Sequence, residues 1–215
     1  MGTIKTQCSF KFSHYEQTLQ SAIAKGYKII KLINYKINRN KIIFLRHDVD
    51  FDLSQALKIA QIERSLGINS SFFIRMHGNY NPFSFNNYLI IKKIQSMGHE
   101  IGLHHELGFA KFTNEDESDL IIKGKFLLES IIGAPIKGIS FHQPSLWNKM
   151  NLDVYSLGFE YDAYQDTFTK HVKYISDSCS RWHDGCMCQF IGKTTKLCIL
   201  THPFWWFEEV SMENY

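Results

Sequence analysis

Short apolar runs alternate along the chain with longer stretches in which apolar residues recur at helical spacing. Four stretches have this spacing and are followed by a glycine, which commonly ends a helix: Tyr15–Lys25, Leu53–Leu66, Phe85–Met97 and Asn114–Ile132. The shorter runs predict strands at Ile42–Leu45, Ser70–Ile74, Glu100–Leu103, Gly138–Phe141, Phe159–Asp162, Val172–Ser176 and Lys196–Thr201. Because strands and helices alternate, we expect parallel strands with right-handed crossovers, which is an α/β fold.

Reactive side chains follow nearly every predicted strand: Asp48 and Asp50, then His104, His105 and Glu106, then His142, Asp177 and His202. The carboxyl ends of parallel strands meet on one face, and only a closed ring lets so many ends surround one point. We therefore predict a distorted (β/α) barrel with about seven parallel strands. The first strand lacks a glycine-rich phosphate-binding motif, which argues against a dinucleotide-binding fold.

Asp48 and Asp50 are two residues apart in an extended segment, so their carboxylates project to the same side. Two carboxylates this close disfavour being charged together unless a cation or a proton lies between them. The alternative is a cluster at the start of a helix. Asp52 is better placed to cap the helix that begins at Leu53, so we interpret Asp48 and Asp50 as a functional pair.

His104 and His105 point apart in an extended strand, so only one of them can join this pair, and Glu106 would share the side of His104. We predict that His104, His142 and His202 converge with the aspartates, because three separate strand ends supply them to one face. For the histidines without such a context, surface or structural roles are expected: His14, His77, His171 and His183.

The composition limits the class of protein. The chain has 215 residues, 44% of them hydrophobic, which is enough for a sizeable core, and it shows no repeat or linker, so we expect a single domain over 1–215. A formal net charge of +3, with scattered basic residues, gives no reason to expect nucleic acid as a partner. We find no secretory signal and no membrane span and predict a cytoplasmic location; the oligomeric state stays open.

The five cysteines form an odd set without Cys-x-x-Cys spacing: Cys8, Cys179, Cys186, Cys188 and Cys198. Four of them lie in the last quarter of the chain. One interpretation is a local metal or redox pair. The other, which we favour, is free thiols in a reducing compartment.

These motifs resemble the polysaccharide deacetylase family (NodB homology domain, carbohydrate esterase family 4). The family surrounds a divalent metal with an aspartate-rich motif, a Gly-His-Glu-Ile-Gly-x-His motif and a late Leu-x-His motif. The matching segments here are Arg46–Asp50, Gly98–His104 and Leu200–Pro203, and Leu66–Phe73 matches the family's second strand. The resemblance runs in the right order from about Ile42 to Trp206.

The resemblance implies a role for each matching residue. Asp48 is expected to be the general base and His202 the general acid, with Asp50 and His104 as metal ligands. Zinc is the expected ion, although mixed oxygen and nitrogen ligands also admit cobalt, manganese or nickel. The residues expected to contact a saccharide, or to shape its site, are Glu106, Asp177, Trp182 and Trp205.

Two positions depart from the family pattern. Gly108 stands where a further histidine ligand is usual, and His142 stands where the third motif carries an arginine that orients the base. Either His142, which we favour, or Glu106 replaces the lost ligand, or metal binding has weakened. The implied activity is metal-dependent removal of an N-acyl group, most simply acetyl, from an amino sugar in a saccharide or surface-polysaccharide precursor. The alternatives are hydrolysis of a non-sugar C–N bond and a degenerate saccharide-binding protein.

Overall fold

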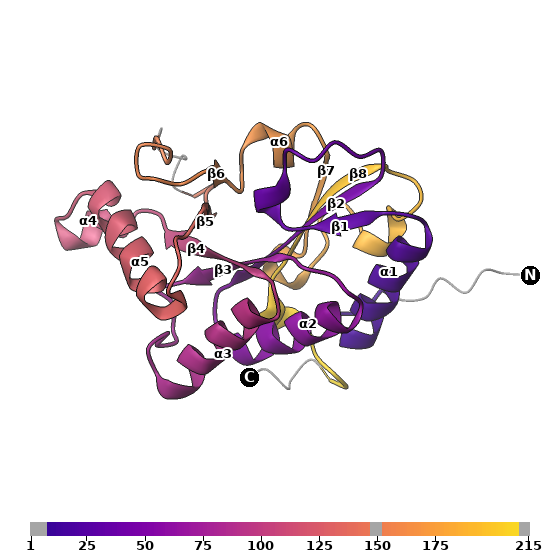
Figure 1. Cartoon of the computed structure of the whole chain (residues 1–215), viewed down its shortest axis with the longest axis horizontal. Coiled ribbons are helices and arrows are strands. Elements are labelled where there is room, and N and C mark those ends of the chain that lie inside the picture. Colours follow the sequence, from indigo (N-terminus) through magenta and orange to yellow (C-terminus); the bar gives the residue numbers. More distant parts are fainter. Residues whose placement is uncertain (1–7, 147–151, 211–215) are drawn as a thin grey trace, which may run out of the picture.

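The computed structural model describes residues 8–146 and 152–210. Its centre is a curled sheet with the strand order β6-β5-β4-β3-β2-β8-β7, and β1 pairs with β2 (Figure 1). All the pairings are parallel. The strands are β1 (Lys28–Ile30), β2 (Ile42–Val49), β3 (Ser71–Arg75), β4 (Glu100–Glu106), β5 (Gly138–His142), β6 (Tyr161–Asp162), β7 (Lys173–Ser176) and β8 (Lys196–Thr201).

The sheet is an open barrel. Within residues 8–146 and 152–210 no pairing joins β6 to β7, so the ring stays open between these two strands. The predicted distorted (β/α) barrel is therefore confirmed. The additional strand, β1, pairs with the first half of β2, while β3 pairs with the second half of the same edge.

The helices pack around the sheet. They are α1 (Phe12–Ala24), α2 (Leu53–Ser65), α3 (Phe85–Ser96), α4 (Ala110–Thr113), α5 (Glu117–Ile132) and α6 (Asp166–Thr169). Along one side of the sheet α1 packs on α2, α2 on α3, and α3 on α5 (Figure 1). The Asp52 carboxylate accepts a hydrogen bond of 2.9 Å from the Ser54 amide, so Asp52 caps α2 as predicted.

The alternation of side chains along β2 divides the core into two layers. Ile42 and Phe44 belong to a small apolar cluster inside the barrel, whereas Ile43, Leu45 and Val49 pack in the larger cluster beneath the helices. Arg46 and Asp48 follow the parity of Ile42 and Phe44, so their side chains point into the barrel. The expected strand end at Leu45 is wrong, because β3 and β8 pair with the polar residues beyond it and extend β2 to Val49.

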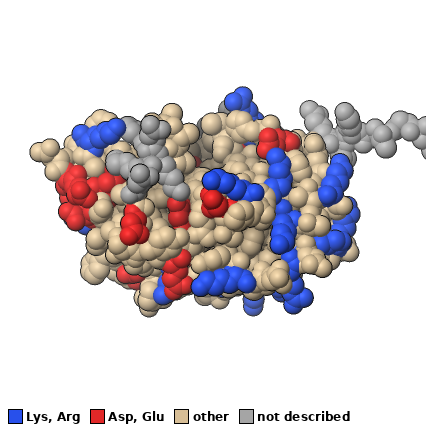
Figure 2. All heavy atoms as spheres, turned by 90° about the horizontal axis from the view of Figure 1, so that it is seen from above, with Lys and Arg blue, Asp and Glu red and all other residues tan. Residues whose placement is uncertain are grey.

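Charge is distributed unevenly over the surface. In Figure 2 most of the visible Lys and Arg side chains lie toward the right-hand end, which in Figure 1 holds α1 and β1. The exposed basic residues between α1 and β2 are Lys25, Lys28, Lys36, Arg39 and Lys41. They lie near the amino ends of β1 and β2, away from the strand ends that carry the reactive residues. Over the described parts of the chain, none of the helices is both long and apolar enough to cross a membrane.

Candidate metal and catalytic site

Three potential ligand atoms converge at the carboxyl ends of β2, β4 and β5. The Nε2 atom of His104 lies 3.0 Å from Oδ1 of Asp50, and Nδ1 of His142 lies 3.2 Å from the same oxygen. All three ligand atoms are within 4.8 Å of one another. Asp50 and His104 are buried, and His142 is partly exposed, so the group is open on the side of His142.

The chemistry of these residues fits a divalent cation. Asp50 Oδ1 and His104 Nε2 are buried atoms without a well-aligned hydrogen-bond partner among the described residues. Burial opposes the charged form of Asp50, but the nearby imidazoles of His104 and His142, with the charge of His202, hold its pKa well below its usual range. One carboxylate and two imidazoles are a ligand set typical of zinc and related ions.

Asp48 is held by an arginine that the sequence analysis missed. The Arg46 Nη2 atom lies 3.1 Å from Asp48 Oδ2, and Ser140 Oγ donates to the same oxygen at 3.0 Å. Arg46 is fully buried, donates to the carbonyl of Ala163 at 2.7 Å and lies over the ring of Tyr164. The sequence could have indicated this contact, because Arg46 lies two positions before Asp48 and side chains at this spacing in a strand point to the same side.

His202 forms the opposite wall of the site. Its Nδ1 atom lies 2.6 Å from Asp177 Oδ1, and Asp177 Oδ2 accepts a hydrogen bond from Trp206 Nε1 at 2.9 Å. Nε2 of His202 faces Asp50 Oδ2 at 3.9 Å. Burial opposes the imidazolium form, but the hydrogen bond and charge of Asp177, with Asp50 and Asp48, raise the pKa of His202 to about 9.

His105 points to the other face of β4, away from His104, as predicted. Its Nε2 atom lies 2.5 Å from the Glu117 carboxylate, which also accepts a hydrogen bond of 3.2 Å from the Gly108 amide. Gly108 has a positive φ of 81°, a conformation that favours glycine over histidine. The backbone turn after β4 thus occupies the position at which the resemblance implied a further histidine ligand.

A cavity of about 960 Å³ opens above the convergent residues. It is lined by all five predicted catalytic and metal-binding residues, Asp48, Asp50, His104, His142 and His202, and by aromatic side chains that include Phe51, Tyr164, Tyr174 and Trp205. This size and this mixture of apolar surface with a few polar groups are typical of small-molecule sites.

The other predicted substrate-contacting residues do not line this cavity. Glu106 is paired with Arg75, and Asp177 is buried beneath His202. The Trp182 ring stacks on Phe10 at a centroid distance of 6.0 Å. Of the four residues, only Trp205 is brought to the cavity.

The fold and the site define an α/β barrel whose strand ends surround one potential metal site. No protein-family model matches the chain, and no curated protein matches it. Among solved structures it is similar to a mutant of a CE4 family pseudoenzyme with restored enzymatic activity, with 14% identity over 77% of this chain and a TM-score of 0.50. The alignment covers 57% of that protein, so the chain spans little more than half of its length.

Two deacetylases also align with the chain. One is the polysaccharide deacetylase of Bacillus cereus, with 19% identity over 76% of this chain and 79% of that chain and a TM-score of 0.48. The other is the chitin deacetylase of Colletotrichum lindemuthianum, with 15% identity over 83% of this chain and 78% of that chain and a TM-score of 0.48. The likeness to the first structure shows the fold alone, which this chain shares with that CE4 family protein.

Proposed function

We propose that the chain is a divergent polysaccharide deacetylase, a metal-dependent hydrolase that removes an N-acyl group, most simply acetyl, from an amino sugar. The observation that carries the proposal is the convergence of Asp50, His104 and His142 on one point, beside Asp48 and His202. A divalent ion at this point would lower the pKa of a water molecule and polarise the amide carbonyl. Zinc fits the three donors best, with cobalt, manganese and nickel as alternatives.

Asp48 and His202 supply the two proton transfers in this proposal. Asp48 accepts the proton of the attacking water while Arg46 and Ser140 fix the orientation of its carboxylate. Because Nδ1 of His202 is engaged by Asp177, its Nε2 faces the cavity and donates a proton to the leaving amine. Arg46 and Asp177 are positioning residues, since each acts through a neighbour.

The cavity favours a saccharide as the substrate. The apolar faces of Trp205, Tyr164 and Tyr174 suit the C–H surfaces of sugar rings, and the polar groups at the base suit an amide. A soluble, nucleotide-linked or lipid-linked precursor agrees with a cytoplasmic location, which stays a prediction. A panel of N-acetylated sugar precursors, assayed for acetate release, tests the substrate class.

Metal content tests the ligand assignment directly. Asp50→Ala and His104→Ala should each lose the ion from this site while the fold is retained, because both residues lie at the rim of the barrel. Elemental analysis measures this loss as a fall in metal content per chain relative to the wild type. His171→Ala, which changes an exposed histidine outside the cavity, is the matched control. A metal content equal to that of the wild type in both variants would show that the assignment is wrong.

The third ligand is tested by a pair of variants. His142→Ala should weaken metal binding by about 10–100-fold or more, whereas Glu106→Ala should leave it unchanged, because Glu106 is bound to Arg75. The reverse result would make Glu106 the ligand. A chain that binds the saccharide but no metal at this site would support the degenerate binding protein instead.

A further inference from the structure

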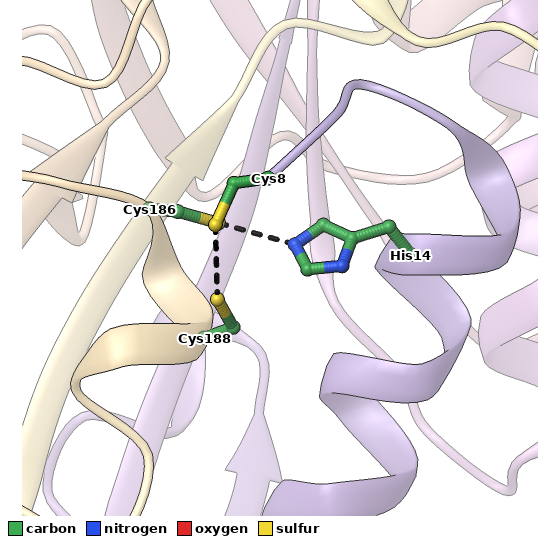
Figure 3. Close-up of side chains that lie close together, drawn as sticks. All are labelled: Cys8, His14, Cys186 and Cys188. Atoms are coloured by element: carbon green, nitrogen blue, oxygen red, sulfur yellow. Dashed lines mark hydrogen bonds between the residues drawn. The ribbon is translucent and has the colours of Figure 1, made fainter. Parts of the chain in front are cut away.

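A second group of potential metal ligands lies outside the candidate active site. Figure 3 shows Cys8, His14, Cys186 and Cys188 with their side chains directed toward one another. Cys8 precedes α1 and His14 lies in its first turn, whereas the other two cysteines flank the start of a short 3-10 helix (Met187–Gln189) between β7 and β8. None of the four residues lines the cavity above Asp50.

The distances between these side chains are close to those of a tetrahedral zinc site. Zn–S bonds of about 2.3 Å and Zn–N bonds of about 2.0–2.1 Å place tetrahedral ligand atoms about 3.8 Å (S···S) and about 3.5 Å (S···N) apart. The Sγ atoms of Cys8 and Cys188 are 3.5 Å apart, and His14 Nε2 is 3.2 Å from Cys186 Sγ. All four ligand atoms lie within 4.8 Å of one another.

We propose that Cys8, His14, Cys186 and Cys188 form a second, structural zinc site. Three thiolates and one imidazole are a ligand set of closed, four-coordinate sites, which leave no position for a substrate. Cys186 is buried and the other three residues are partly buried, so the site is largely enclosed. Each cysteine binds as a thiolate and gives its proton to the solvent.

The site joins two distant parts of the chain. Cys8 and Cys188 are separated by 180 positions, and the segment after Cys8 is already held by a parallel bridge between Lys11 and Phe207. Phe10, in this segment, packs edge-on against Trp206, whose indole donates to Asp177. The zinc ion therefore fixes the N-terminal segment against the wall that carries the His202–Asp177 pair.

A disulfide is the competing interpretation of this cluster. The distance of 3.5 Å between the Cys8 and Cys188 sulfurs exceeds a bond length of about 2.05 Å. A disulfide between these two would leave Cys186 and His14 without a shared function, although the His14 ring is directed at the Cys186 sulfur (Figure 3). The metal site uses all four residues, and it is independent of the proposed deacetylase activity.

Cobalt(II) distinguishes this site from the one at Asp50. The full chain is purified under reducing conditions, stripped of metal and titrated with cobalt alone. Thiolate ligands give an intense sulfur-to-cobalt charge-transfer absorption in the near ultraviolet, which a site of carboxylate and imidazole ligands lacks. We expect the wild-type chain to show this absorption. In Asp50→Ala, which removes a ligand of the other site, the absorption should persist and saturate at about one equivalent of cobalt per chain.

Variants of the cluster complete the test. Cys188→Ser and His14→Ala should each abolish or strongly weaken the absorption, while Cys179→Ser, the same chemical change at an exposed cysteine outside the cluster, should leave it intact. Zinc added in equal amount should displace the cobalt and remove the absorption. The proposal is overturned if the folded, reduced wild-type chain shows no charge-transfer absorption with cobalt, or if the absorption survives in Cys188→Ser. The first of these results is obtained with the wild-type chain, so the proposal can be overturned even if a variant fails to fold.

Discussion

Replacing Arg46 by methionine should strongly destabilise the fold, because it leaves the Asp48 carboxylate inside the barrel without its counter-ion. Arg46 and Asp48 form an ion pair at 3.1 Å in which the side chains are 0% and 1% exposed. Methionine fills much of the volume of the arginine but cannot pair with Asp48, which keeps the hydrogen bond from Ser140. The cost is therefore mainly that of a buried charge without its counter-ion.

Removing one partner of a buried ion pair costs about 3–5 kcal/mol. For a chain of this length each kcal/mol lowers the melting temperature by about 2–4 °C, so Arg46→Met should melt roughly 6–20 °C below the wild type. Replacing both partners removes the stranded charge, so the double variant Arg46→Met/Asp48→Asn should be more stable than the sum of the two single changes predicts, with a coupling free energy of about 1–3 kcal/mol.

Urea denaturation of the wild type, both single variants and the double variant measures this cycle. Lys123→Met is the control, because Lys123 pairs with Glu115 on the surface, with side chains 59% and 37% exposed. An exposed pair of this kind contributes about 0–1 kcal/mol. The reasoning is refuted if Arg46→Met costs no more than Lys123→Met, or if the effects of the two buried changes simply add.

Three further predictions concern other parts of the molecule. Burial opposes ionisation of Glu63, but His47, His99 and Ser70 together lower its pKa below the ordinary value of 4.5. The ionised Glu63 therefore stabilises the fold above pH 4.5, and this contribution is lost at lower pH. Glu63→Gln should lower the free energy of unfolding by about 1.5–3 kcal/mol at pH 7. Urea denaturation should show the difference between the wild type and the variant decreasing toward about pH 3. Gly138→Ala should cost about 1–3 kcal/mol in thermal unfolding, because a Cβ atom there meets the fully buried Tyr161 ring; an unchanged melting temperature would mean that this ring can move. Trp205→Ala should raise KM for a saccharide substrate about tenfold with little change in kcat, and an unchanged KM would remove Trp205 from the binding surface.

The layout of helices and strands could be predicted because the apolar residues follow regular periods. Each of the four predicted helices corresponds to an observed one, and the glycines that follow them have positive φ, as C-terminal stops do. β1 was not predicted, because Lys28–Ile30 is too short to show a period. The end of β2 was misplaced because its pairing with β3 and β8, rather than local hydrophobicity, determines where that strand ends.

The grouping of Asp48, Asp50 and His104 follows from strand parity and motif order, both of which are properties of the sequence. The contacts of Asp48 do not follow, because Ser140 comes from a strand far along the chain and Ala163 anchors Arg46 from the segment after β6. Likewise, the cluster around His14 brings together residues from both ends of the chain, so no local spacing could indicate it.

The two departures from the family pattern are related through Arg46. If no arginine reached Asp48, His142, which stands at the position of the usual arginine, would be needed to orient the Asp48 carboxylate. Arg46 reaches Asp48 from within the same strand, at 3.1 Å, while His142 Nδ1 lies 3.2 Å from Asp50. His142 is therefore available as the ligand that Gly108 cannot provide. Arg46 and His142 thus offer replacements for the two elements that the resemblance implied, which supports the hydrolase that we propose over a degenerate binding protein.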